Sequence, residues 1–107
     1  MKYLRLKKNN DFQRLFKKGK RAYSRLLTVI YLPSKADKTV MGIALSKKHG
    51  KAVKRNRIKR LIRAAFRENM DRLNGRYSLI IMPKICEEYD YRQIESSLIA
   101  CMGRMQG

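Results

Sequence analysis

Residues 46–66, SKKHGKAVKRNRIKRLIRAAF, combine the densest positive charge in the chain with its longest helical periodicity. From about Val53, apolar side chains recur at the three- and four-residue spacing that places them on one face of an α-helix. These side chains are Ile58, Leu61, Ile62, Ala65, Phe66, Met70 and Leu73. We expect this face to pack into a core, so the rest of the chain must supply the surface that covers it.

The opposite side of the same helix is basic. Its cations stand in a four-spaced row with two neighbours beside it: Lys59, Arg63 and Arg67, with Arg57 and Arg60. Because no Asp or Glu lies between positions 38 and 67, nothing nearby in sequence relieves the repulsion within this row. Ordinary solvated helix faces mix Glu with Lys, so the pattern favours binding of a polyanion over a merely solvated surface.

The net charge of +19 is unevenly distributed along the 107 residues. Residues 1–67 contain 22 Lys and Arg against 2 acidic residues, whereas residues 68–107 contain 5 against 6. The partner is therefore expected to contact the first two thirds of the chain. The length and a hydrophobic content of 44% predict a single globular domain covering residues 1–107.

Residues that commonly perform catalysis are scarce in the basic part of the chain. His49 lies in a run of Lys with no carboxylate close in sequence, so a phosphate contact or a bystander role suits it better than that of a general base. Cys86 and Cys101 have neither paired spacing nor a neighbouring His, which argues against a metal site and favours two buried free thiols over a disulfide. We expect a domain that binds and does not itself cut, with no catalytic residue and no metal ligand in the protein.

The start of the sequence lacks the apolar run of a signal peptide, and no stretch approaches transmembrane length. We therefore expect a cytoplasmic protein with no membrane partner.

Residues 1–8 form a tethered basic arm in this interpretation. A short first helix follows, with Asn9 or Asn10 as its N-cap and Gly19 just after its end. Phe12 and Phe16 share one face of this helix. Packing into the core is the commoner role for two such rings, but rings at the lip of a groove also offer unpaired bases a stacking surface.

Apolar runs at residues 26–32, 40–45 and 77–82 predict three strands, the first covered on both faces. A hairpin is the simplest connection between the first two. If the third pairs parallel to the second, the basic helix becomes a strand–helix–strand crossover. We expect Asn74 and Gly75 to end that helix, and a capping box from Asp90 to Gln93 to begin a last helix that extends to Met105.

Residues 47–60, KKHGKAVKRNRIKR, resemble the "RNR" signature of the protein subunit family of bacterial ribonuclease P. Asp11, Phe12, Phe16 and Gly19 resemble the first-helix pattern of that family, and residues 77–83 resemble its last strand. The resemblance extends over almost the whole chain. It implies an α+β fold, α-β-β-β-α-β-α, like domain 2 of ribosomal protein S5, with a left-handed βαβ crossover.

The resemblance also implies a function. A partner RNA would hydrolyse precursor tRNA at the 5′ end of the mature sequence with bound Mg²⁺, without an organic cofactor or an obligate protein partner. The protein would bind both this RNA and the single-stranded 5′ leader, and would lower the Mg²⁺ demand of the reaction.

The family's site residues map onto two sets of positions. The set implied to face the catalytic RNA is Lys47, Lys48, Lys51, Arg55, Asn56, Arg57, Lys59, Arg60 and Arg63. The set implied to bind the leader, between the first helix and the sheet, is Phe12, Phe16 and Tyr31, flanked by Arg14 and Lys17.

Three alternatives belong to other classes. A general RNA-binding, ribosomal or RNA-chaperone protein would bind precursor and mature tRNA alike. A protein-only nuclease would need carboxylates gathered around a metal, but the acidic residues lie mainly in the final third. A reader of double-stranded DNA is disfavoured because nothing beyond the one basic helix suggests a recognition helix with dimer symmetry.

Overall fold

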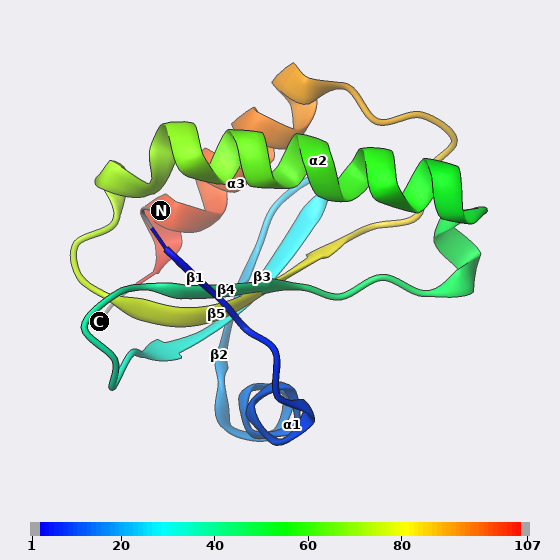
Figure 1. The fold of residues 1–107 in the computed structure, drawn as a ribbon. Helices are drawn as coiled ribbons and strands as arrows, with labels where there is room; N and C mark the ends of the chain where they lie inside the picture. The colour runs from blue at the N-terminus through cyan, green and yellow to red at the C-terminus, as the bar shows by residue number, and fades with distance from the viewer. Residues whose placement is uncertain (1–2, 106–107) are drawn as a thin grey trace.

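The computed structural model describes residues 3–105, and Figure 1 shows their arrangement. Three α-helices and five strands form two layers of helix around one sheet within these residues. The strands are β1 (Leu4–Arg5), β2 (Lys20–Tyr23), β3 (Leu27–Pro33), β4 (Val40–Ile43) and β5 (Tyr77–Pro83). The α-helices are α1 (Asn9–Lys18), α2 (Ala52–Asn69) and α3 (Tyr91–Arg104), and two 3-10 turns are η1 (Lys47–His49) and η2 (Met70–Arg72).

The sheet has the strand order β1-β4-β5-β3-β2, so β5 is the central strand. It pairs parallel to β4 and antiparallel to β3. Helices α2 and α3 cover one face of the sheet and α1 lies against the other (Figure 1). The predicted α+β fold is confirmed, with the short β1 as an addition at one edge.

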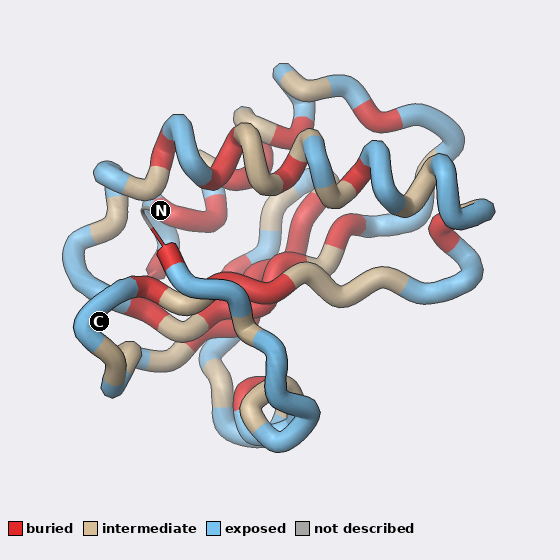
Figure 2. Tube along the Cα trace, in the orientation of Figure 1, coloured by how far each residue is buried: buried red, intermediate tan, exposed pale blue. Residues whose placement is uncertain are grey.

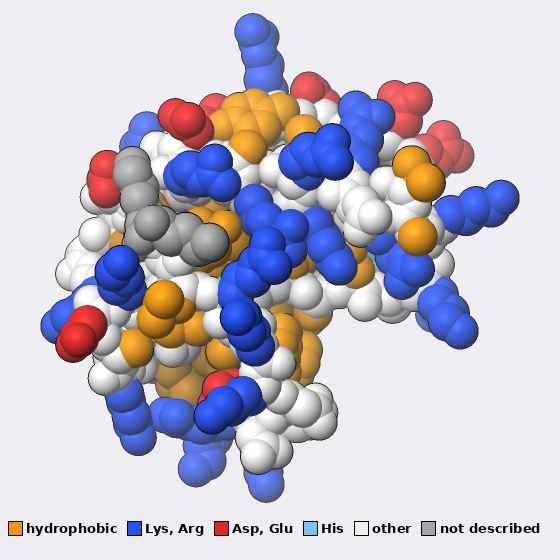
Figure 3. Space-filling model, viewed as in Figure 1, with side chains coloured by type: hydrophobic (Ala, Val, Ile, Leu, Met, Phe, Trp, Pro, Cys, Tyr) orange, Lys and Arg blue, Asp and Glu red, His pale blue; other side chains and the backbone are white. Residues whose placement is uncertain are grey.

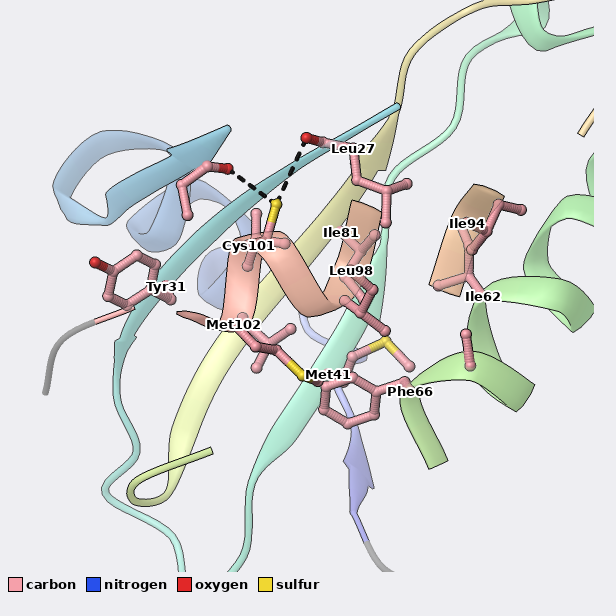
Figure 4. Close-up of a cluster of buried hydrophobic side chains, with 14 of the residues drawn as sticks. Leu27, Tyr31, Met41, Ile62, Phe66, Ile81, Ile94, Leu98, Cys101 and Met102 are labelled. Atoms are coloured by element: carbon pink, nitrogen blue, oxygen red, sulfur yellow. Dashed lines mark hydrogen bonds between the residues drawn. The ribbon is translucent and has the colours of Figure 1, made fainter. Parts of the chain in front are cut away.

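The apolar face predicted for the basic helix packs as expected. In α2, Ile58, Ile62, Ala65 and Phe66 are buried in the core between the helices and the sheet. Leu61, Met70 and Leu73 are partly buried against the same cluster. Figure 4 shows side chains from α2, α3 and the sheet meeting in this core, and Figure 2 shows that burial is concentrated there.

The β4–α2–β5 connection is the predicted parallel crossover. In Figure 1, β4 lies in front of β5 and α2 lies above both, so the path from β4 over α2 to β5 is left-handed. The general preference is strongly for the right-handed path, so composition and periodicity alone would have predicted the opposite hand.

The hairpin predicted between the strands at residues 26–32 and 40–45 is wrong. β5 lies between β3 and β4 and pairs with both. β5 is apolar on both faces, which suits the centre of a sheet that helices cover on both sides. The link after β3 instead passes the start of β5, where the Ser34 N–H donates to the Arg76 carbonyl over 2.9 Å.

The N-terminal arm is docked and not free from Tyr3 onward; residues 1–2 lie outside the described part. Leu4 pairs with Val40 at the sheet edge. The Tyr3 ring is 5% exposed and meets the Phe66 ring edge-to-face at a centroid distance of 5.1 Å. This burial anchors the segment that the sequence predicted only as a tethered arm.

Two predicted helix boundaries differ from the structure. Lys8, not Asn9 or Asn10, is the N-cap of α1, and its carbonyl accepts the Asp11 and Phe12 N–H groups. At the other end of α1, Gly19 follows the last helical residue, as predicted. Glycine is required there for close approach, because a Cβ would lie 2.5 Å from the Ile30 Cγ2.

The basic helix ends at Asn69, before the expected Asn74 and Gly75. The Asn69 Nδ2 donates to the Ala65 carbonyl over 2.8 Å and to Glu95 Oε2 of α3 over 2.9 Å. The side chain therefore satisfies a carbonyl of the last helical turn and fixes α2 to α3. At the start of α3, Asp90 is the predicted N-cap and accepts the Arg92 N–H.

Candidate nucleic-acid interface

Residues 46–51, which we call the basic loop, connect β4 to α2 and present Lys47, Lys48 and Lys51 to solvent. His49 in this loop is 8% exposed, and both of its ring nitrogens are bonded. Nδ1 accepts the Ser46 N–H over 3.0 Å, so Nε2 carries the proton and donates it to the Pro83 carbonyl over 2.7 Å. His49 therefore holds the loop against the end of β5. Of the two predicted roles, the phosphate contact is wrong, because the ring is buried and both of its nitrogens are bonded.

Gly50 gives the basic loop its shape. Its φ of 111° lies in the region that side-chain-bearing residues rarely adopt, and a Cβ there would also lie 2.8 Å from the Lys54 Cδ. This conformation turns the chain from η1 into Lys51, the N-cap of α2. The loop geometry thus requires glycine at this position.

The cations of α2 point in different directions. Lys59 and Arg63 line a cleft of 410 Å³ together with Arg5, Lys7 and Phe12. Asn56, Arg60 and Arg67 are exposed on the outer side of the helix. In Figure 3, Lys and Arg side chains form a continuous column from α2 across the N-terminal segment towards α1.

Arg57 lies on the other flank of α2. It lines a second cleft with Lys54, and Glu87, Glu88 and Asp90 line the same cleft. Lys54 is engaged there, because its Nζ donates to the Cys86 carbonyl over 3.2 Å and lies 5.8 Å from the centre of the Tyr89 ring. The positive potential is therefore weakened by acids on this flank, and is strongest on the flank of Lys59 and Arg63.

Arg55 is half-buried in the first turns of α2. Its Nε is buried without a hydrogen-bond partner in the described part of the chain. The basic set predicted from the sequence thus lies on one loop and one helix, but it faces at least three directions.

Phe12 and Phe16 lie on the α1 side of the sheet and are half-buried. Both rings pack against the cluster of Leu15, Ile30 and Ile80. Gly42 provides the space for Phe12, since a Cβ there would lie 2.9 Å from the ring Cζ. Packing and partial exposure coexist in each ring, so the same side chains can support α1 and contact a ligand.

Arg14 and Lys17 are exposed on α1. Together with Phe16 they line a shallow pocket completed by Gln13 and Lys18. The structure therefore brings these two cations to Phe16, one of the three predicted aromatic side chains.

Tyr31 is not brought together with Phe12 and Phe16. Its side chain lies in the core on the α2 and α3 side, is 5% exposed, and meets the Tyr77 ring at 5.8 Å and 81°. Successive strand residues face opposite sides of the sheet, so assignment to the α1 face was wrong by one residue. Ile30 occupies the α1 face at this point of β3.

Arg5 and Lys7 are interface candidates that the sequence analysis missed as individual positions. They line the cleft because β1 pairs with β4 at the sheet edge. The sequence predicted a tethered arm at residues 1–8 and not a strand. A signal was present in Leu4 and Leu6, whose alternation with Arg5 and Lys7 is a strand pattern.

Cys86 and Cys101 are both free, as predicted. Cys101 is buried, but Cys86 is only half-buried, which corrects the expectation of two buried thiols. Burial raises the pKa of the Cys101 thiol, so it is protonated and unreactive at neutral pH. In the range 3–105, no three His, Cys, Asp or Glu side chains are grouped so that they could hold a metal ion, and no helix is long and apolar enough to cross a membrane.

Comparisons with known proteins agree with this geometry. The ribonuclease P family model matches residues 1–106. The ribonuclease P protein component of Bacillus cereus is 43% identical over 98 residues, which cover 89% of this chain and 84% of the relative. That of Clostridium botulinum is 36% identical over 101 residues, covering 92% and 91%.

Solved structures are similar as well. The RNase P protein from Thermotoga maritima has a TM-score of 0.86 at 28% identity, covering 96% of this chain and 98% of its own. The protein from Staphylococcus aureus has a TM-score of 0.83 at 35% identity, covering 94% and 93%. The family model and the solved structures thus agree over nearly the whole chain. This chain therefore belongs to the ribonuclease P protein family, and is the protein component of that RNA-processing ribonucleoprotein enzyme.

Proposed function

We propose that the protein assists a catalytic RNA in removing the 5′ leader from precursor tRNA, and that the RNA performs the hydrolysis. The support is the family together with the distribution of chemistry over the molecule. The basic surface contains no His available as a base, since His49 is buried and bonded through both nitrogens. The protein's role in this proposal is to bind and position two RNAs, in the cytoplasm and without an obligate protein partner.

The basic loop and the exposed side of α2 are the proposed contact with the catalytic RNA. The proposed contacts are Lys47, Lys48, Lys51, Arg55, Asn56, Arg57, Lys59, Arg60 and Arg63. Their charge lowers the repulsion between two approaching polyanions, and the counterions that they displace add a favourable entropy. The role of His49 is to hold the loop from which three of these lysines project.

The α1 side of the sheet is the proposed site of the leader. Phe12 and Phe16 offer partly exposed rings on which unpaired bases stack, and Arg14 and Lys17 lie beside them for the phosphates. The strongest support for the proposal is one observation. Phe12 shares a cleft with Lys59 and Arg63, so a single strand bound on α1 stays within reach of the cations of α2.

Mg²⁺ is implied by the family, and the described residues do not fit a resident site for it. They offer no group of three carboxylates, imidazoles or thiols, and the acidic residues near α2 share their cleft with Lys54 and Arg57. We therefore propose that Mg²⁺ is held by the RNA. The cations of the protein replace part of the diffuse Mg²⁺ that would otherwise screen the two RNAs, which lowers the demand for it.

The leader site is tested by Phe16→Ala in the complex assembled with the cognate RNA. Affinity for precursor tRNA is expected to fall by about 1 to 3 kcal/mol, whereas affinity for mature tRNA stays unchanged. Phe16→Tyr retains an aromatic face and serves as the matched control. Equal losses for both ligands would contradict leader binding, and would fit a general RNA-binding protein instead.

A further inference from the structure

Tyr23 is an exposed aromatic residue at the end of β2, and none of the roles described above involves it. Its side chain is 55% exposed. The strand register places Tyr23 opposite Thr28 of β3, and Thr28 opposite Met82 of β5. These three residues therefore form one row across three strands.

The row lies on the α1 face of the sheet. Ala22 is buried in the core on the α2 and α3 side, so its neighbour Tyr23 projects from the opposite face. Met82 in the same row packs against the cluster of Ile30 and Ile80, which Phe16 also contacts. Tyr23 thus extends, towards the β2 edge, the surface that begins at Phe16.

The other end of the row reaches the basic loop. The Ala44 N–H donates to the Ile81 carbonyl over 3.1 Å, and Pro83, next to Met82, accepts the bond from His49. A strand that follows the row therefore runs from the proposed contact with the catalytic RNA to Tyr23.

Cations flank the Tyr23 end. Arg21 lies two residues earlier on the same face of β2 and is exposed. The Lys84 Nζ donates to the Ser24 carbonyl over 3.0 Å, which places a second cation close to Tyr23. Arg25 lies on the other side of the sheet, where it lines a pocket with Arg92 and Ser97 of α3. An aromatic face with cations on its flanks is the arrangement that binds single-stranded nucleic acid.

The ring of Tyr23 is not needed to hold the fold. The contacts that fix this end of β2 come from its backbone and its neighbours: Arg104 donates to the Tyr23 carbonyl, and the Cys101 thiol contacts the Ala22 carbonyl and Ser24 Oγ. All of these come from α3, on the other face of the sheet. Removal of the ring is therefore expected to leave the structure intact.

We propose that Tyr23 is a stacking platform for an unpaired base of the 5′ leader, and that it extends the bound length of the leader beyond Phe16. This inference rests on the proposed function, because it assumes that the leader lies on the α1 face. It adds a specificity role: Tyr23 sets how many leader nucleotides contribute to affinity.

The test uses the complex of the full chain with its RNA and a series of precursor tRNAs whose leaders lengthen by one nucleotide. For the unaltered protein, affinity is expected to rise with leader length and then to level off. Tyr23→Ala should level off at a shorter leader and bind the longest leaders about five- to a hundredfold more weakly, as loss of one stacked base predicts. Tyr23→Phe should behave like the unaltered protein, and unchanged thermal unfolding of both variants verifies the fold.

The outcomes separate the two proposals. If the unaltered protein gains nothing from a longer leader, leader binding itself is wrong. If it does gain, and Tyr23→Ala follows the same curve, leader binding stands and the role of Tyr23 is overturned. Weaker binding that is equal at every leader length would also overturn it, because a platform at the far end affects only leaders that reach it.

Discussion

The imidazole Nε2 of His49 donates a hydrogen bond to the carbonyl oxygen of Pro83 over 2.7 Å, joining the basic loop to the end of the central strand. Because Nδ1 also accepts the Ser46 N–H, the ring satisfies two backbone groups at once. The position of the loop lysines relative to the α1 face therefore depends on a side chain that does not itself contact RNA in our proposal.

The first prediction is that His49→Ala lowers the free energy of unfolding by about 1 to 3 kcal/mol, because the Pro83 carbonyl in a buried bond and the Ser46 N–H in a partly buried one lose their partner. Urea denaturation of the isolated protein measures this change. Lys48→Ala is the matched control: it removes an exposed charge, and should weaken RNA binding without a comparable loss of stability. A His49→Ala variant as stable as the unaltered protein would show that the two hydrogen bonds contribute nothing.

The second prediction concerns the core beneath the basic helix. Ile62 is fully buried, so Ile62→Ala should cost about 2 to 5 kcal/mol through lost burial and a residual cavity. Val53, on the same helix, is 83% exposed, and Val53→Ala should change stability by less than about 0.5 kcal/mol. Denaturant unfolding of the two variants side by side checks the orientation of α2. Similar losses for both would contradict it.

The third prediction uses the salt dependence of RNA affinity to distinguish side chains that contact RNA from side chains that do not. Arg57→Ala should weaken assembly with the catalytic RNA and reduce the salt slope of log affinity by about one. Arg76 provides the control: it is exposed, lies outside the basic loop and α2, and donates to the Asp37 carbonyl over 3.0 Å.

Binding titrations over a range of KCl concentrations give both slopes. Arg76→Ala should retain the slope of the unaltered protein. An unchanged slope for Arg57→Ala would place this side chain, which shares its cleft with Glu87, Glu88 and Asp90, outside the RNA contact.

The fourth prediction concerns the thiols and alkaline pH. Burial raises the pKa of Cys101 above its ordinary 9.0, so the folded state holds this proton more tightly than the unfolded state does. Its contribution to stability is therefore complete below pH 9.0 and is lost as the pH rises through the higher pKa of the folded state. Cys101→Ala should flatten this alkaline loss, measured by urea unfolding over a pH series, whereas Cys86→Ala should retain it.

Reactivity gives an independent check on the same residues. In the native protein, iodoacetamide should modify the half-buried Cys86 and spare Cys101, and both should react after unfolding. Rapid native modification of Cys101 would contradict its burial.

Much of the fold could be predicted from the sequence because long periodic segments leave few choices. The apolar faces of α2 and α3 and the doubly covered β3 follow from side-chain spacing. The position of β5 between β3 and β4 could not be predicted, because the pairing of strands far apart in sequence depends on the whole sheet. The hand of the crossover came from family resemblance alone.

The candidate site was predictable in its residue types and less so in its geometry. Charge and spacing indicated the basic face of α2, whereas the full RNA-facing set came from the family resemblance. The division of this set between the flanks of α2 depends on where α3 and the loop at residues 87–90 lie. Tyr31 was assigned to the wrong face of the sheet, because an error of one residue in a strand moves a side chain from one face to the other. His49 was misassigned because its partner, Pro83, is 34 positions away in the chain.

The central claim is that the protein binds and positions RNA while the cutting is left to its RNA partner. The most direct measurement is cleavage of precursor tRNA by protein alone, by the cognate RNA alone, and by the two together, each over a Mg²⁺ titration. We predict no cleavage by protein alone, cleavage by RNA alone at high Mg²⁺, and cleavage at lower Mg²⁺ when both are present. Accurate removal of the leader by the purified protein without RNA, or a Mg²⁺ titration unchanged by the protein, would contradict the account.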